Sequence, residues 1–482
     1  MASSSASFAP PTRIKAEPLL LLCFLILADL VILGAAAVLQ VKGLLLLLGG
    51  LVFLCLARRT EWALAFLLIG YPIISPLARA THMAGPIYHG LRLFAMGLLG
   101  IAILFNDKGT LSEFWNGFRR QPIFWATAGI LSMFFIGTFY SSAPDYGMFK
   151  VMAFGSKSFL FMILLITQGW IWGRDGEAAQ GLRRFLSAVW LFLCVIALTA
   201  ALNLAFNFDD SGGRLRALAL NPIWLARFAG LGLLMTPYAA HRLHWPWSVS
   251  GIFLLLFGAV MLGTGSRGPA VAVGAAAFST LVLHWIDNRR KGRSHQNEAL
   301  LFTSILVVIT GLILLPNALK TRFLYAGSSF ISYNLSWSMR VFLYQQAFHL
   351  VPQAGPFGLG TGGFAAAIVS KDLRLYPHNV FLEIFIENGW LGFLLFGFFL
   401  YLIWRMANQL LRHRPEFSPE VHLILMLVVY ALVNAMASGD IAFNEEIYIW
   451  AGLLGALKTA TSIGPQPKSG EPPPSKLLIG GR

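Results

Sequence analysis

The stretch RFLSAVWLFLCVIALTAALNLAF, residues 184–206, decides the class of fold, because it carries no charged side chain after its first residue. About 20 apolar residues in a helix are enough to cross a hydrocarbon core of about 30 Å. Similar runs recur along the 482-residue chain, which is 57% hydrophobic and only 12% charged, with a mean hydropathy of +0.69. Soluble domains carry about 25% charged residues. The sequence therefore predicts an all-α polytopic membrane protein and excludes an ordinary soluble enzyme or a disordered chain.

Fourteen segments have the pattern of a membrane span, and two of them are short, so 12 to 14 transmembrane helices are expected. The segments are 18–40, 43–57, 62–78, 90–106, 122–140, 151–172, 184–206, 223–241, 247–264, 269–286, 299–315, 379–404, 421–437 and 446–461. The first is too long for a signal-peptide core and lacks a clear cleavage site. The three cysteines lie in apolar runs without metal-ligand spacing, so no disulfide, metal site or cofactor is expected.

The net charge of +15 at pH 7 has a topological explanation, because cytoplasmic loops of membrane proteins are rich in lysine and arginine. The charge therefore does not point to a nucleic-acid partner. With both termini placed in the cytoplasm, 22 of the 36 basic residues fall on the cytoplasmic side. The other 14 lie on the outer side or within spans, where this bias disfavours them. They are Lys42, Arg79, Arg92, Lys150, Lys157, Arg214, Arg216, Arg227, Arg267, Lys320, Arg322, Arg340, Lys371 and Arg374.

Such a set of cations fits an anionic ligand, above all a phosphate, whose oxygens match the guanidinium fork of arginine. For individual residues the alternative is contact with lipid headgroups or pairing with nearby carboxylates.

One connection on the outer side is far longer than the others, and loops of this length are usually functional or disordered. In this loop, residues 338–350 are predicted to form an amphipathic helix with Val341, Tyr344 and Phe348 on one side. The Gly-rich segment GPFGLGTGGF follows at 355–364. The expected organisation is a cytoplasmic tail over 1–17, membrane helices over 18–315, the large structured loop over 316–378, membrane helices over 379–461 and a disordered cytoplasmic tail over 462–482.

Arg267 lies in GTGSRGP, residues 263–269, a predicted tight turn between two apolar helices. Small residues such as Gly265 let the backbone approach a ligand closely, and the free N–H groups of the following helix favour an anion. Arg214 and Arg216 precede a span, Arg227 lies one turn inside it, and Lys157 lies within another. Basic residues inside spans indicate function, so all of these are candidate anion-binding residues.

His378 ends the long loop in Pro-His-Asn, and the helix after Asn379 carries Glu383 and Glu387 on one face. A histidine beside carboxylates can accept a proton from a hydroxyl nucleophile. The alternative is a histidine that merely caps the helix or lies at the membrane interface.

Taken together, these segments resemble the O-antigen ligase and polymerase superfamily of bacterial envelope glycosyltransferases. The resemblance rests on four features in the family's order, over about residues 211–400. They are the basic segment from Arg214 to Pro222, the turn Ser266-Arg267-Gly268, the helix from Ser338 and Arg340 with its Gly-rich sequel, and the His378-Asn379 segment with Glu387 and Gly389.

The resemblance implies an inner-membrane enzyme of lipopolysaccharide biosynthesis whose site faces the periplasm. The donor would be a glycan on undecaprenyl pyrophosphate, and the acceptor a sugar hydroxyl, most simply on lipid A-core. The transfer would be inverting and independent of metal. Arg216, Arg267 and Arg340 would hold the pyrophosphate, with Arg214, Arg227 and Lys157 in support and Gly265 and Gly360 shaping the site. His378 would act on the acceptor hydroxyl, with Asn379 in support and Glu383 or Glu387 holding its tautomer.

Two alternatives stay open. Within the superfamily, the chain could be a polymerase or a ligase that attaches oligosaccharides to protein, and the motifs do not separate these activities. In a different class, it could be a flippase or another transporter of lipid-linked oligosaccharides, which also needs a basic cavity. A transporter would more often show repeated spans and does not need a long outer loop that ends in a histidine.

Overall fold

The computed structural model describes residues 59–74, 96–97, 99–100, 115, 117–206, 214–218, 220–290 and 330–463. The regular structure in these ranges is helical. Its α-helices are α3 (Thr60–Ala65), α7 (Pro122–Thr138), α8 (Pro144–Phe154), α9 (Leu160–Arg174), α10 (Ala178–Phe206), α11 (Pro222–Leu243), α12 (Trp247–Gly263), α13 (Arg267–Arg290), α16 (Phe330–Leu350), α17 (Gly363–Val369), α18 (Val380–His413), α19 (Ser418–Ala435) and α20 (Glu446–Ser462). The expected spans 18–40, 43–57 and 299–315 lie outside the described residues, as do most of 90–106 and the end of 62–78.

Among the described residues, five helices are long and apolar enough to cross a membrane, which confirms the prediction of an all-helical polytopic membrane protein. They are Pro144–Arg174, Ala178–Asn203, Pro222–Leu243, Val380–His413 and Pro415–Ala435. The first combines α8 and α9 through a π-helical turn, Gly155–Phe159. Shorter apolar helices accompany these five, among them Pro122–Thr138 and Trp247–Gly263. The total of 12 to 14 spans stays a prediction.

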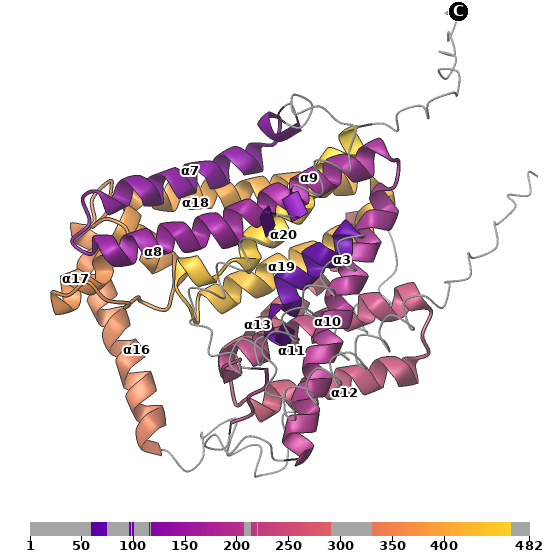
Figure 1. The fold of residues 1–482 in the computed structure, drawn as a ribbon, viewed down its shortest axis with the longest axis horizontal. Helices are drawn as coiled ribbons and strands as arrows, with labels where there is room; N and C mark the ends of the chain where they lie inside the picture. The colour runs from indigo at the N-terminus through magenta and orange to yellow at the C-terminus, as the bar shows by residue number, and fades with distance from the viewer. Residues whose placement is uncertain are drawn as a thin grey trace, which may run out of the picture.

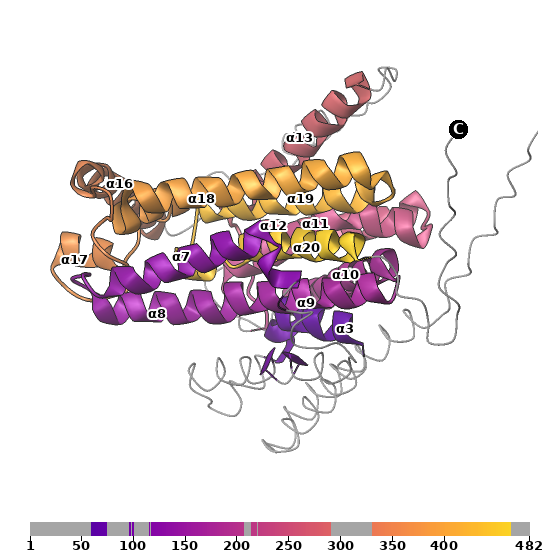
Figure 2. The same cartoon turned by 90° about the horizontal axis from the view of Figure 1, so that it is seen from above.

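The helices form an antiparallel bundle in which α7, α8, α18 and α19 run side by side (Figures 1 and 2). Small residues bring the bundle together, as between α9 and α20. A Cβ atom at Gly169 would lie within 2.2 Å of the carbonyl oxygen of Ala456, and one at Gly173 within 2.6 Å of that of Ala460. Close approach at small residues spaced four apart is typical of membrane helices, where dispersion contacts drive association.

The residues predicted to be cytoplasmic lie at one end of the bundle. There Arg183 Nε donates to Glu420 at 3.0 Å and Arg414 donates to the carbonyl oxygen of Thr461 at 2.7 Å. The opposite end collects the starts of α8 and α18, the short helix α17 and the helix α16, which runs across the bundle there (Figure 1). The predicted amphipathic helix, the Gly-rich segment and the start of α18 therefore lie together at this second end.

The helix α18 is broken near its start, at Gly389, whose φ of 66° and ψ of −170° are not helical. The Gly-rich segment fills the break. The carbonyl oxygens of Gly355 and Pro356 accept the N–H groups of Trp390 and Leu391, each at 3.2 Å. The outer turns of α18 are thus joined to the long loop by backbone hydrogen bonds.

Gly389→Ala is expected to destabilise the protein by about 2 kcal/mol or more, because the new Cβ combines an unfavourable φ with overlap. That Cβ would lie 2.3 Å from the carbonyl oxygen of Pro356. Gly397→Ala is the matched control on the same helix, since its Cβ would meet nothing within 4 Å. Alanine is the better helix former, so this control should be neutral or slightly stabilising. Thermal unfolding in detergent measures both variants, and equal midpoints would contradict the account of the break.

The predicted helix at 338–350 is present as the second half of α16, but the prediction of its apolar side needs a correction. The face packed on the protein is made by Leu343, Ala347 and Leu350, which join Phe364 and Ile386 in a small core. Phe348 is 64% exposed and Val341 36% exposed. Apolar residues lie on two sides of this helix, and the sequence pattern did not show which side packs.

Candidate functional site

The basic segment before α11 and the turn between α12 and α13 lie together, although about fifty residues separate them in the sequence. Arg214 donates from Nε to the carbonyl oxygen of Thr264 and from Nη2 to Ser266 Oγ, both at 2.9 Å. The N–H of Leu215 donates to the carbonyl oxygen of Gly263 at 3.0 Å. Gly265 has a φ of 63°, so the turn uses the left-handed conformation that glycine adopts readily. Arg214 thus helps to hold this turn.

Arg267 begins α13 directly after this turn and is partly exposed. Its N-terminal position on the helix agrees with the expectation from the sequence. The side chain of Arg216 is exposed, while its backbone oxygen accepts a hydrogen bond from Asn203.

Arg340, from α16, lies within electrostatic reach of this cluster. Burial lowers the pKa of Arg214 below its ordinary value, and the positive charges of Arg216 and Arg340 lower it further. Three cations repelling one another at an open end of the bundle form a region where an anion would be stabilised.

His378 lies beside the same arginine. Burial lowers its pKa from 6.5 to about 4; the positive charges of Arg340 and Arg374 lower it as well, and Asp440 opposes them. Its φ of 57° is in the left-handed region, and its ring packs on that of Tyr376 with centroids 4.5 Å apart. Nδ1 is buried and has no hydrogen-bond partner among the residues that the structure describes. His378 is therefore a neutral imidazole at pH 7 with an unoccupied nitrogen.

Asn379 is the N-cap of α18. Its side-chain oxygen accepts the N–H groups of Phe381 at 3.0 Å and Leu382 at 3.3 Å. This cap fixes the direction in which the chain enters the helix just after His378. Asn379 thus supports His378 by fixing the backbone that follows it.

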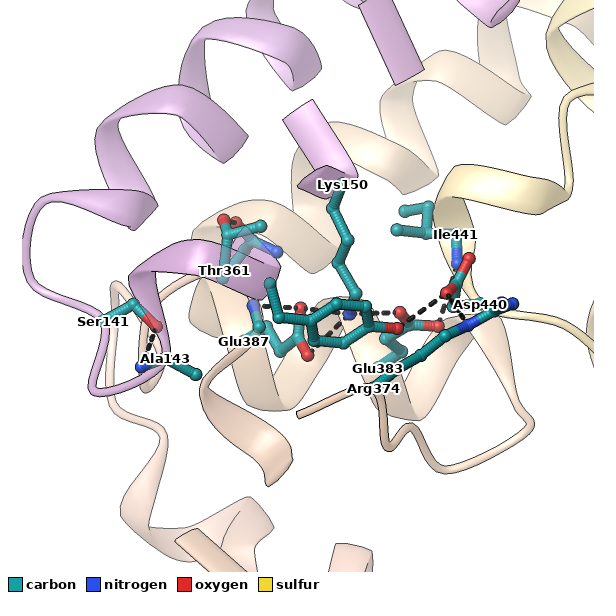
Figure 3. A network of polar contacts seen from close by, with 12 residues as sticks. Ser141, Ala143, Lys150, Thr361, Arg374, Glu383, Glu387, Asp440 and Ile441 are labelled. Atoms are coloured by element: carbon teal, nitrogen blue, oxygen red, sulfur yellow. Dashed lines mark hydrogen bonds and ion pairs between the residues drawn. The ribbon is translucent and has the colours of Figure 1, made fainter. Parts of the chain in front are cut away.

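The prediction that Glu383 or Glu387 orients His378 is wrong, because both carboxylates bind Lys150 instead (Figure 3). Lys150 Nζ lies 2.6 Å from Glu383 Oε1 and 2.7 Å from Glu387 Oε1, and all three side chains are buried. A buried carboxylate needs a cation and hydrogen bonds, and Lys150 supplies the cation from α8. Sequence reasoning left this lysine among the outer basic residues without a role.

Backbone groups complete the network around Lys150. Glu387 Oε2 accepts the N–H of Gly362 at 2.9 Å, and Glu383 Oε2 accepts that of Ile441 at 3.1 Å. The two carboxylates therefore join α8, α18, the Gly-rich segment and the connection between α19 and α20. One signal could have indicated the arrangement: two glutamates four residues apart in an apolar helix require a buried cation.

The structure places Arg227 inside the bundle, against α19 and α20, whereas the sequence predicted that it supports pyrophosphate binding. It is 1% exposed, and its Nη2 donates to the carbonyl oxygens of Asn434 at 3.1 Å and Ser438 at 2.8 Å. Nη2 also lies 3.0 Å from Asn444 Oδ1, and Nη1 lies 3.7 Å from Glu446 Oε2. A charge inside a span is costly unless it is paired, so Arg227 fastens α11 to α19 and α20.

Gly360 and Lys157 are also placed differently from expectation. A Cβ atom at Gly360 would lie 2.6 Å from Ser141 Cα and 2.7 Å from the carbonyl oxygen of Gly137, so this glycine permits close packing on the end of α7. Lys157 Nζ lies 4.2 Å from the centre of the Phe443 ring.

Within the parts of the chain that the structure describes, no group of three or more His, Cys, Asp or Glu side chains is arranged to hold a metal ion. The site consists of arginines from three segments and one histidine, at one end of a membrane-spanning bundle. The class of protein is thus a polytopic membrane protein, and these cations at one end of its bundle are its candidate site.

Residues 252–397 match the family model described as O-antigen ligase. The matched region includes Arg267, Arg340 and His378, while Arg214, Arg216 and Lys150 lie before it. No curated protein matches the chain. The family implies membrane glycan transfer of the O-antigen ligase or polymerase type.

Proposed function

We propose that this protein is an inverting glycosyltransferase that moves a glycan from undecaprenyl pyrophosphate to a sugar hydroxyl, most simply an O-antigen ligase that acts on lipid A-core. The observation that supports it is the position of Arg340, which acts electrostatically on both Arg214 and His378. One arginine thus connects the cationic cluster with the neutral histidine. A donor diphosphate and an acceptor hydroxyl require these two environments side by side.

In the proposed reaction, His378 acts on the acceptor hydroxyl and the arginines act on the leaving diphosphate. The acceptor oxygen attacks the anomeric carbon from the face opposite the diphosphate, and its proton passes to the neutral imidazole of His378. The bond between the anomeric carbon and the diphosphate oxygen breaks, and undecaprenyl pyrophosphate leaves with the electron pair. Arg216, Arg267 and Arg340 stabilise the negative charge that develops on it. Arg214 supports them by holding the turn of Gly265.

Helix lengths support an outer site. Along α8 and α9, Lys150 and Arg174 are 24 positions apart, or about 36 Å at 1.5 Å per residue. That is slightly more than the hydrocarbon thickness of about 30 Å. With Arg174 at the cytoplasmic surface, Lys150 lies near the outer boundary of the membrane and His378 beyond it. We place the site on the periplasmic side of a bacterial inner membrane.

Arg340→Ala is expected to lower transfer by about 10²-fold or more, because it removes a cation from the developing charge. Purified protein in detergent receives a glycan on undecaprenyl pyrophosphate and lipid A-core, and the glycosylated acceptor is measured on gels. Arg412→Ala, exposed at the other end of α18, is the control and should retain full activity.

Four outcomes would contradict parts of this proposal. Transfer at the normal rate by Arg340→Ala would remove Arg340 from the site. Modification of a second lipid-linked glycan instead of lipid A-core would make the enzyme a polymerase, and movement of donor across vesicles without transfer would make it a flippase. Loss of activity with a chelator would overturn the metal-independent reaction.

A further inference from the structure

Asp372 and Arg374 fasten the segment from Asp372 to His378 to the bundle. Asp372 accepts the N–H groups of Asp145 at 2.8 Å and Tyr146 at 3.1 Å, at the start of α8. Arg374 forms an ion pair with Asp440, and Tyr376 packs on the ring of His378.

Asp440 is the fixed end of the central anchor. Its carboxylate is fully buried, and Oδ2 accepts the hydroxyl of Tyr146 at 2.6 Å while Oδ1 accepts the N–H of Phe443 at 3.1 Å. The next residue, Ile441, donates its N–H to Glu383 in the Lys150 network. Asp440 is therefore held by α8 and α18 before Arg374 reaches it (Figure 3).

Arg374 is the movable end of the same anchor. Its side chain is 50% exposed, its Nε lies 3.5 Å from Asp440 Oδ2, and its guanidinium carbon lies 4.3 Å from the centre of the Phe443 ring. This ion pair and stacking contact join a surface segment to a buried carboxylate four residues before His378.

The histidine needs such a restraint. A φ of 57° costs about 1 kcal/mol or more for a residue with a Cβ, so a free segment would leave this conformation. Asn379 caps α18 on one side of His378, and the contacts of Arg374 restrain the other side.

We infer that the ion pair between Asp440 and Arg374 is a positioning element that holds His378 in register for glycan transfer. The inference rests on the proposed function of His378. Neither Asp440 nor Arg374 touches the reacting atoms in this account, so both act through the histidine.

The charges that face His378 predict how the pH dependence of transfer changes when either partner of the ion pair is removed. They are Arg340 from α16, Arg374 from the histidine's own segment and Asp440 from the connection between α19 and α20. Removing Arg374 removes a positive charge and raises the pKa of His378, whereas removing Asp440 lowers it. A base must be unprotonated to act, so the acid limb of kcat/KM moves to higher pH in the first variant and to lower pH in the second.

The experiment compares Arg374→Gln and Asp440→Asn with the unchanged protein in the transfer assay from about pH 2.5, below the His378 pKa of about 4, up to pH 8. Asp440→Asn keeps the shape of the side chain, and Arg374→Gln removes the charge but keeps a polar side chain. We expect kcat to fall about 10- to 100-fold in both, because a small misplacement of a reacting group has that effect. The acid limbs should move in opposite directions, which mere loss of folded protein would not cause.

Arg414→Gln is the matched control: another half-exposed arginine in an ion pair, with Glu416, at the far end of α18. It should leave kcat and the acid limb unchanged. Acid limbs that stay in place, or rates equal to the control, would overturn the inference. Full activity of His378→Asn would instead overturn the proposed function, so the two failures are distinguishable.

Discussion

Replacing His378 by asparagine is expected to lower kcat for glycan transfer by about 10²- to 10⁴-fold, the usual contribution of a general base. Asparagine suits this position because it tolerates the left-handed conformation that His378 adopts, with φ at 57°. Loss of activity can then be assigned to the imidazole instead of to the backbone. His349→Asn is the control, since His349 is an exposed histidine on α16, and it should retain activity.

A stability measurement on the same variant tests the environment of His378 independently. The pKa of this histidine is about 4 in the folded protein and near 6.5 in the unfolded chain. Between these values the unfolded chain binds more protons, so the free energy of unfolding decreases as the pH falls from 6.5 to 4. His378→Asn removes this contribution and should flatten that decrease. An unchanged pH dependence together with full activity would contradict the assignment.

Lys150→Met is expected to destabilise the protein by about 3 to 5 kcal/mol, because removing one partner of a buried ion pair leaves uncompensated charge. Here two buried carboxylates, Glu383 and Glu387, would lose their cation. Thermal unfolding in detergent should show a large fall in the midpoint, together with loss of transfer activity. Both effects follow because the carboxylates hold Gly362 and Ile441.

The triple variant Lys150→Met with Glu383→Gln and Glu387→Gln separates charge from packing. Glutamine oxygens can still accept the N–H groups of Gly362 and Ile441, while no net charge stays buried. Its midpoint should recover most of the loss. A triple variant as unstable as Lys150→Met alone would show that the lysine acts through packing and not through its charge.

The membrane helices were predictable because hydropathy is a local property of the sequence. The expected segments 122–140, 223–241, 247–264 and 446–461 agree with α7, α11, α12 and α20 to within a few residues. The turn of Gly265 was predictable for the same reason. Its partner was not, since hydrogen bonds from Arg214 to Thr264 and Ser266 depend on how two distant segments meet.

The partners of buried charges were not predictable from spacing. Glu383 and Glu387 are near His378 in sequence, which suggested a contact, but the buried cation of Lys150 binds both. The sequence marked Arg227 as unusual, and the structure assigns that charge to fastening helices. A charged residue inside a span thus marked a position that matters. It did not show whether the charge binds a ligand or holds helices of the protein together.

The Lys150 network also imposes an order on biosynthesis. The lysine is made 233 residues before Glu383 and 237 before Glu387. At about 5 to 20 residues per second, the ribosome needs roughly 10 to 50 s to supply these partners. During that interval α8 is in the membrane with a cation whose counter-ions do not yet exist, and a lysine near the boundary can reach the headgroups meanwhile. The end of α8 that carries Lys150 therefore reaches its final packing late. Lys150 becomes buried only after α18 has been synthesised and has packed against α8.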